Sequence, residues 1–333
     1  MSKEEIIEQA EKLIKAGKYD KAIKEYQKLL EEDPSDMRAK LKIGDLYAKN
    51  KEMPNALKNY REVADYYSQE NFHLKAIAVY KTVLKLSPSA IEVNGKLGAL
   101  YHEVGLDQDA INQYYIVAGY YDGKGMLKES MEVRKKILEI DPSNTTSRIR
   151  LAELMQQDGK TEDSLHEYEQ AASVLTSKKD REALIEVYEK MLYYRPDNVD
   201  MLVDLCRIYF EKREFKRALR RIELAPASSK NSLDILGLWA EALLEERQVD
   251  ASRKKFKELY TKSLETQDAE RSAKVYSRIL QEFNDDEDYL KELEEMRKNT
   301  GMEHEKVKPK YRQDFESTQM VDLSKMDELM KKK

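Results

Sequence analysis

The chain has 333 residues, of which 37% are charged and 41% hydrophobic, with 11 glycines and 7 prolines. This balance is typical of a helical protein with a solvated surface and argues against a β-rich or disordered chain. The net charge of −5 mixes both signs without a basic block, which argues against nucleic acid as the principal ligand.

The termini and the cysteine content bear on location. The first residues lack the apolar core of a signal peptide, and no apolar run approaches the ~20 residues that span a bilayer. A single cysteine, Cys206, excludes an intrachain disulfide and fits a reducing compartment. We therefore expect a cytoplasmic protein without membrane insertion.

Residues 3–36 have the spacing of a 34-residue helix-turn-helix repeat. Its large, small and aromatic positions are Leu13, Gly17, Tyr19, Ala22 and Tyr26, and Pro34 closes it. This pattern resembles the tetratricopeptide repeat (TPR) family, of the bacterial cytoplasmic type. The resemblance implies pairs of antiparallel helices in which small residues allow close approach and tyrosines fill the gaps beside them.

The prolines that follow are spaced by a longer, 54-residue period. Pro34, Pro88, Pro142 and Pro196 stand at equal intervals along the chain. Each is expected to stop the preceding helix, and the serines after three of them (Ser35, Ser89, Ser143) to cap the next helix. A fixed period of this length predicts a repeat array in which each unit packs on its neighbours.

The 54-residue period exceeds a 34-residue repeat by the length of one helix and its turn, so one helix in each unit is expected to serve two repeats. Three helices carry both sets of small and aromatic positions: residues 55–68, 108–121 and 162–175. We therefore expect three helices per long unit, and a change of curvature at each one.

The complete prediction is an all-α, right-handed TPR-like solenoid of about 16 repeat helices plus a capping helix. Its domain spans residues 1–298, with 54-residue three-helix units alternating with 34-residue helix pairs. The units are 3–36, 37–90, 91–144, 145–198, 199–232 and 233–286, and the capping helix is 287–298.

The end of the chain differs from the repeats. Residues 299–333 have the composition of a flexible tail, except for a short amphipathic motif at 321–330. Its apolar side chains are expected to dock on this chain or on another, the alternative being incidental apolar residues in a disordered tail. They are Val321, Leu323, Met326, Leu329 and Met330.

No convergent catalytic or metal-ligating set is visible. The four histidines are scattered without a second ligand at metal spacing, and there is no phosphate-binding glycine loop. Cys206 occupies a small core position, which favours a packed, inert thiol. We therefore expect no enzyme activity and no cofactor.

The resemblance to TPR proteins also suggests where a partner would bind. One TPR subclass grips chaperone carboxylate tails with Lys and Asn, and here Ile7, Glu11 and Asp45 stand instead, which argues against such a clamp. The family's concave-face positions form a mixed apolar and polar strip, which could bind a peptide or helix or be an ordinary solvated face. They are Leu41, Asp45, Ala99, His102, Ile149, Glu153, Arg207 and Phe210.

These features predict a non-catalytic scaffold or adaptor that holds other proteins on its helical surface. The alternative is a regulatory adaptor, switched by its own C-terminal tail or by a small GTPase or signalling partner. The sequence does not identify the partner.

Overall fold

A computed structural model describes residues 2–300, and the chain divides into two compact units. Unit 1 ends at Ser177 and unit 2 begins at Lys178. Eighteen α-helices and no strand occur among the described residues, which confirms the all-α prediction. None of these helices has the length and apolar character needed to cross a membrane. The tail motif at 321–330 lies outside the described residues.

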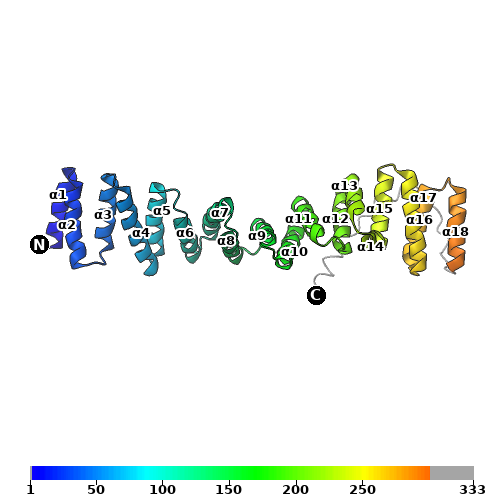
Figure 1. The fold of residues 1–333 in the computed structure, drawn as a ribbon, viewed down its shortest axis with the longest axis horizontal. Helices are drawn as coiled ribbons and strands as arrows, with labels where there is room; N and C mark the ends of the chain where they lie inside the picture. Colours follow the sequence, from blue (N-terminus) through cyan, green and yellow to red (C-terminus); the bar gives the residue numbers. More distant parts are fainter. Residues whose placement is uncertain (1, 301–333) are drawn as a thin grey trace. The chain divides into compact units, whose positions relative to one another are not determined.

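Unit 1 is a succession of helices joined by short turns, drawn side by side in chain order in Figure 1. Each helix from α1 to α8 packs on the one that follows it. The helices are α1 (Lys3–Lys15), α2 (Tyr19–Glu32), α3 (Met37–Lys49), α4 (Met53–Gln69), α5 (His73–Leu86), α6 (Ile91–Glu103), α7 (Asp107–Lys124), α8 (Leu127–Ile140), α9 (Thr145–Gln157) and α10 (Thr161–Lys178).

Unit 2 continues the pattern with one addition, the four-residue helix α14 after Pro226, which the sequence did not predict. Its last helix ends at Thr300, two residues beyond the predicted capping helix. The helices are α11 (Arg181–Tyr194), α12 (Val199–Glu211), α13 (Phe215–Leu224), α14 (Ala227–Lys230), α15 (Leu233–Glu245), α16 (Val249–Glu265), α17 (Ala269–Glu282) and α18 (Glu287–Thr300).

The helices predicted to serve two repeats lie within α4, α7 and α10. These three and α16 are the long helices of the described chain, since none of the others is longer than α2. Moreover, α7, α8 and α9 begin one 54-residue period after α4, α5 and α6, respectively. The helix boundaries thus follow the period of the sequence, and the assignment of each long helix to two repeats stays a prediction.

The prolines act as predicted, but the serines do not. The helices α2, α5, α8 and α11 each end two residues before their proline, because proline disfavours helical conformation in the residue preceding it. The caps lie one residue after the predicted serines: the side chain of Asp36 accepts from the backbone of α3, and that of Asn144 from α9. The Ser35 and Ser143 hydroxyls instead donate to Asp33 and Asp141.

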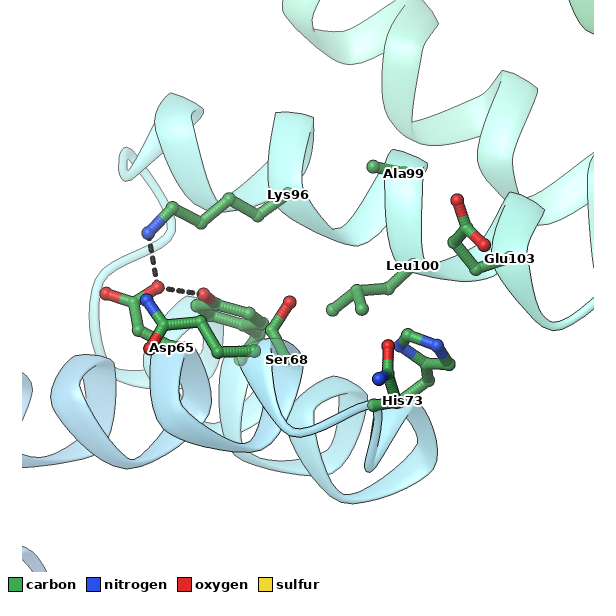
Figure 2. A pocket seen from close by; sticks show the side chains of 10 residues that line it. Asp65, Ser68, His73, Lys96, Ala99, Leu100 and Glu103 are labelled. Carbon is green, nitrogen blue, oxygen red and sulfur yellow. Dashed lines mark hydrogen bonds and ion pairs between the residues drawn. The ribbon is translucent and has the colours of Figure 1, made fainter.

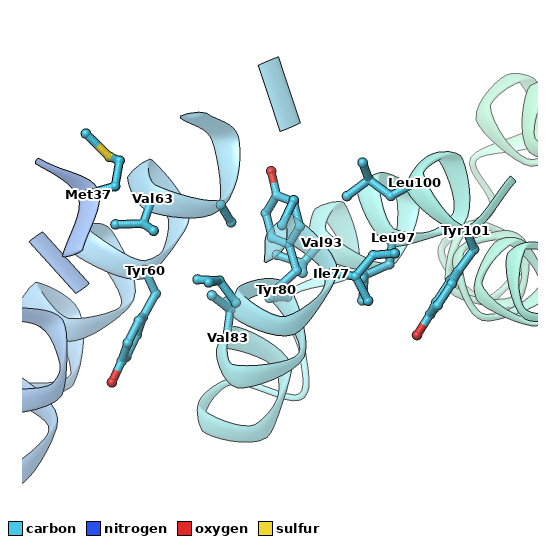
Figure 3. Close-up of a cluster of buried hydrophobic side chains, with 14 of the residues drawn as sticks. Met37, Tyr60, Val63, Ile77, Tyr80, Val83, Val93, Leu97, Leu100 and Tyr101 are labelled. Atoms are coloured by element: carbon cyan, nitrogen blue, oxygen red, sulfur yellow. The ribbon is translucent and has the colours of Figure 1, made fainter. Parts of the chain in front are cut away.

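The core of unit 1 consists of tyrosines and branched aliphatic side chains that interleave between consecutive helices. Figure 3 shows Tyr60, Tyr80 and Tyr101 extending between neighbouring helices alongside Val63 and Leu97. Small residues make room for the rings. A Cβ atom built on Gly98 would lie 2.9 Å from Cε1 of Tyr114, and one on Gly44 would lie 3.2 Å from Cε1 of Tyr60. Glycine at these two positions therefore sets how closely the helices approach.

Candidate functional site in unit 1

A polar pocket opens between α4, α5 and α6, with a volume of about 440 Å³. Asp65 and Ser68 come from α4, His73 from the start of α5, and the remaining labelled residues from α6 (Figure 2). The lining residues are Asp65, Ser68, Gln69, Asn71, His73, Tyr80, Lys96, Ala99, Leu100 and Glu103.

At one end of the pocket, the carboxylate of Asp65 binds two donors. The carboxylate of Asp65 accepts a hydrogen bond from the Tyr80 hydroxyl and pairs with the Lys96 ammonium. The Lys96 Nζ also lies 5.5 Å from the centroid of the Tyr80 ring. Burial, together with the bond to Asp65, raises the pKa of Tyr80 well above its usual range, so the hydroxyl stays protonated and keeps donating.

The same tyrosine-to-aspartate bond occurs one helix earlier. The Tyr60 hydroxyl donates to Oδ1 of Asp45 at 2.8 Å, and in both pairs the aspartate precedes the tyrosine by 15 residues. Burial, with the hydrogen bond to Asp45, raises the pKa of Tyr60 as well. The recurrence indicates that these bonds are primarily part of helix packing. The pocket differs in that its aspartate, Asp65, also pairs with Lys96.

The other end of the pocket holds groups that have no partner among the described residues. Glu103 makes no ion pair there, and the side chains of Ser68, Gln69 and Asn71 make no hydrogen bond. In Figure 2 the Leu100 side chain lies between the Asp65–Lys96 pair and the side chains of His73 and Glu103. The pocket therefore offers the exposed side chain of Ala99 and the small exposed part of Leu100, which is 4% exposed, with a carboxylate, a hydroxyl and two amides around them.

The left-handed turn after α4 brings Asn71 and His73 to the rim. Asn71 has φ +60°, a conformation that asparagine tolerates better than most side chains. The backbone N–H of Phe72 then donates to the carbonyl of Tyr67 at 2.8 Å, which closes the end of α4. Phe72 itself is 48% exposed beside the pocket, with the ammonium of Lys75 4.5 Å from its ring centroid.

The strip predicted from the sequence is only partly related to this pocket. Of its eight residues, Ala99 alone lines the pocket. Asp45 is engaged by Tyr60, Glu153 by Arg150 at 2.9 Å and His102 by Asp107 at 2.7 Å. Leu41 and Ile149 are half-buried, Leu41 against the core.

The two predicted strip residues in unit 2 also contact other side chains. Arg207 pairs with Asp204 at 3.4 Å, and Phe210 packs edge-on against Phe215. A role for the strip in binding stays a prediction.

The described residues bring together no group of three or more His, Cys, Asp or Glu side chains that could hold a metal ion. Cys206 on α12 is fully buried, and this burial raises the pKa of its thiol to about 12. A thiol in this state is a poor nucleophile at neutral pH, because the thiolate is the reactive form.

Comparison with known protein families identifies a repeat near the start of the chain. Residues 7–71 match the model of the tetratricopeptide repeat family. No curated protein gave a significant match. One similar solved structure is a complex of yeast Sti1, described as "TPR2AB-domain:pHSP90-complex", with 15% identity over 90% of this chain and 98% of that chain and a TM-score of 0.29. A second is YrrB, described as "a TPR protein with an unusual peptide-binding site", with 14% identity over 70% of this chain and 90% of that chain and a TM-score of 0.25. A third is a tetratricopeptide repeat protein from Parabacteroides merdae, with 13% identity over 88% of this chain and 97% of that chain and a TM-score of 0.22.

Proposed function

We propose that this chain, whose residues 7–71 match the tetratricopeptide repeat model, is an interaction scaffold that holds a segment of a partner protein in the pocket between α4, α5 and α6. The observation that carries the proposal is the set of unengaged polar groups around Leu100. Hydroxyl and amide side chains without internal partners can bond to the backbone of an extended peptide, and Ala99 can contact one of its side chains.

The fixed end of the pocket supports the same proposal. Asp65, Tyr80 and Lys96 hold one another in place, so a partner meets a surface whose side chains are already ordered. Binding to an ordered surface costs less conformational entropy than binding to flexible side chains. The regulatory adaptor predicted from the sequence, switched by the C-terminal tail or by a small GTPase or signalling partner, is the second candidate.

A pocket-filling variant tests the proposal. Ser68→Asp with Ala99→Glu places larger charged side chains in the pocket, and the matched control Ala78→Glu with Ser173→Asp adds the same charges at exposed positions outside it. Wild type and control should enrich the same sequences from a phage-displayed library of random peptides. The pocket-filling variant, shown to be folded by circular dichroism, should not enrich them. Equal enrichment by all three proteins would contradict the proposal.

A further inference from the structure

The residues that line the pocket between α4, α5 and α6 have counterparts in the next period of unit 1, on α7, α8 and α9. Because these helices begin one 54-residue period after their equivalents, each pocket residue has a counterpart at that offset. Tyr80 and Lys96 correspond to Arg134 and Arg150. The small residues Ser68 and Ala99 correspond to Asp122 and Glu153.

The four counterparts, Arg134, Arg150, Asp122 and Glu153, form one ionic cluster. Asp122 accepts from Arg134 at 2.7 Å and from Arg150 at 3.3 Å, and Arg150 donates to Glu153 at 2.9 Å. The Arg134 residue is only 6% exposed. These side chains therefore hold one another, and every charge in the cluster has a partner of opposite sign.

The pocket between α4, α5 and α6 lacks both of those carboxylate side chains, since Ser68 and Ala99 stand in their places. Its own lysine is already paired with Asp65. Glu103, in contrast, is an exposed carboxylate without an ion pair among the described residues, and its counterpart one period later is the uncharged Gln157. The lining of the pocket thus has room for a side chain and one uncompensated negative charge.

We infer that the pocket takes a basic side chain, arginine or lysine, from the partner segment, with its cationic end paired to Glu103. This inference rests on the proposed function. The aliphatic stem of such a side chain can lie against the exposed Ala99 while the charged head reaches the carboxylate. An acidic side chain finds no free cation in the lining, because Lys96 is engaged by Asp65.

The test compares arginine with its uncharged isostere citrulline. The probes are the blocked peptides acetyl-Gly-Gly-X-Gly-Gly-amide, with X as arginine, citrulline or glutamate, titrated while the methyl NMR signals of Ala99 and Leu100 are recorded. The arginine peptide should shift these signals and bind about three- to tenfold more tightly than the citrulline peptide, as expected for a partly exposed charge-assisted contact. The glutamate peptide should bind more weakly than both.

Two variants identify the carboxylate. Glu103→Gln should abolish the preference for arginine over citrulline, and the control Glu129→Gln, on the exposed surface of α8, should keep it. Equal binding of arginine and citrulline, a preference for glutamate, a preference that survives Glu103→Gln, or no shift at Ala99 and Leu100 with any probe would each overturn the inference. Library peptides that bind wild type but not the pocket-filling variant would then still support the proposed function.

Discussion

Two glycines on α6 have opposite physical roles. A Cβ on Gly98 would lie 2.9 Å from the Tyr114 ring, whereas one on Gly95 would meet nothing within 4 Å. Gly98→Ala should therefore overpack the contact between α6 and α7 and lower the free energy of unfolding by about 1–3 kcal/mol. Gly95→Ala is the matched control and should raise it by about 0.5–1 kcal/mol, because alanine favours a helix. Urea denaturation of both variants measures these changes in the free energy of unfolding. Equal effects would contradict the packing role.

Several turns place ordinary residues where glycine would be less strained. Arg213, after α12, has φ +56° and an exposed side chain, and the next backbone N–H donates to the carbonyl of Tyr209 at 2.8 Å. A left-handed conformation costs a non-glycine residue about 1–2 kcal/mol, which is partly offset by the greater flexibility of unfolded glycine.

Arg213→Gly should therefore stabilise the protein by up to about 1 kcal/mol, measured as an increase in the urea midpoint. Arg213→Ala, which keeps the Cβ atom, should give no such gain. A loss of stability in the glycine variant would show that the arginine side chain contributes more than its backbone strain costs.

Helices α7 and α8 are joined by an ion pair between the carboxylate of Asp122 and the buried guanidinium of Arg134. Burial raises the pKa of Asp122, but its hydrogen bonds with Ser130 and Arg134 and the charges of Arg134 and Arg150 outweigh burial, so the pKa lies below its ordinary value. A carboxylate with a lowered pKa stabilises the folded state above the unfolded-state pKa of about 3.9. That contribution is lost as the pH falls through the lower folded-state value.

Asp122→Asn should cost about 3 kcal/mol at neutral pH, because it leaves the guanidinium of Arg134 buried beside an uncharged amide. The difference from wild type should stay constant down to about pH 4 and shrink below it. Urea denaturation across this range is the measurement, with the exposed Asp109→Asn as control. A difference that does not depend on pH would show that the charge of Asp122 is not responsible.

The positions of the helices were predictable because they depend on local rules that recur with the period. The prolines and the alternation of small and aromatic residues locate every long helix, since each acts within one turn or on the adjacent helix. Helix α14 was missed because a four-residue helix after Pro226 carries no periodic pattern. The cap positions were wrong by one residue because Asp36 and Asn144 compete with the preceding serines for the same role.

The pocket was less predictable, because it depends on which side chains from separate helices come within reach. The resemblance to TPR proteins predicted Asp45 and Glu153 as concave-face residues for a partner, and in the structure Tyr60 and Arg150 engage their side chains. Ala99 was predicted for its position, and Glu103 was not considered. The signal that could have found the pocket is the comparison of periods, in which Ser68 and Ala99 are replaced by Asp122 and Glu153.

At the scale of the molecule, each unit contains a core built from contacts between successive helices. In a repeat array, stability is approximately the sum of the repeats and their nearest-neighbour interfaces, so a local defect should not spread evenly. This reasoning applies to the two units separately: a defect within one of them should open the helices near it and leave the helices of the other closed.

Hydrogen exchange measured by mass spectrometry can follow the opening of each helix in the intact chain. Gly98→Ala should speed exchange in α5 to α8 and leave α15 to α18 close to wild type. Ile279→Ala, at a fully buried position on α17, should do the reverse. If either variant speeds exchange by the same factor in all of these helices, the two units unfold as one cooperative body. The nearest-neighbour description would then be wrong, because a defect on one helix would have destabilised helices with which it makes no contact.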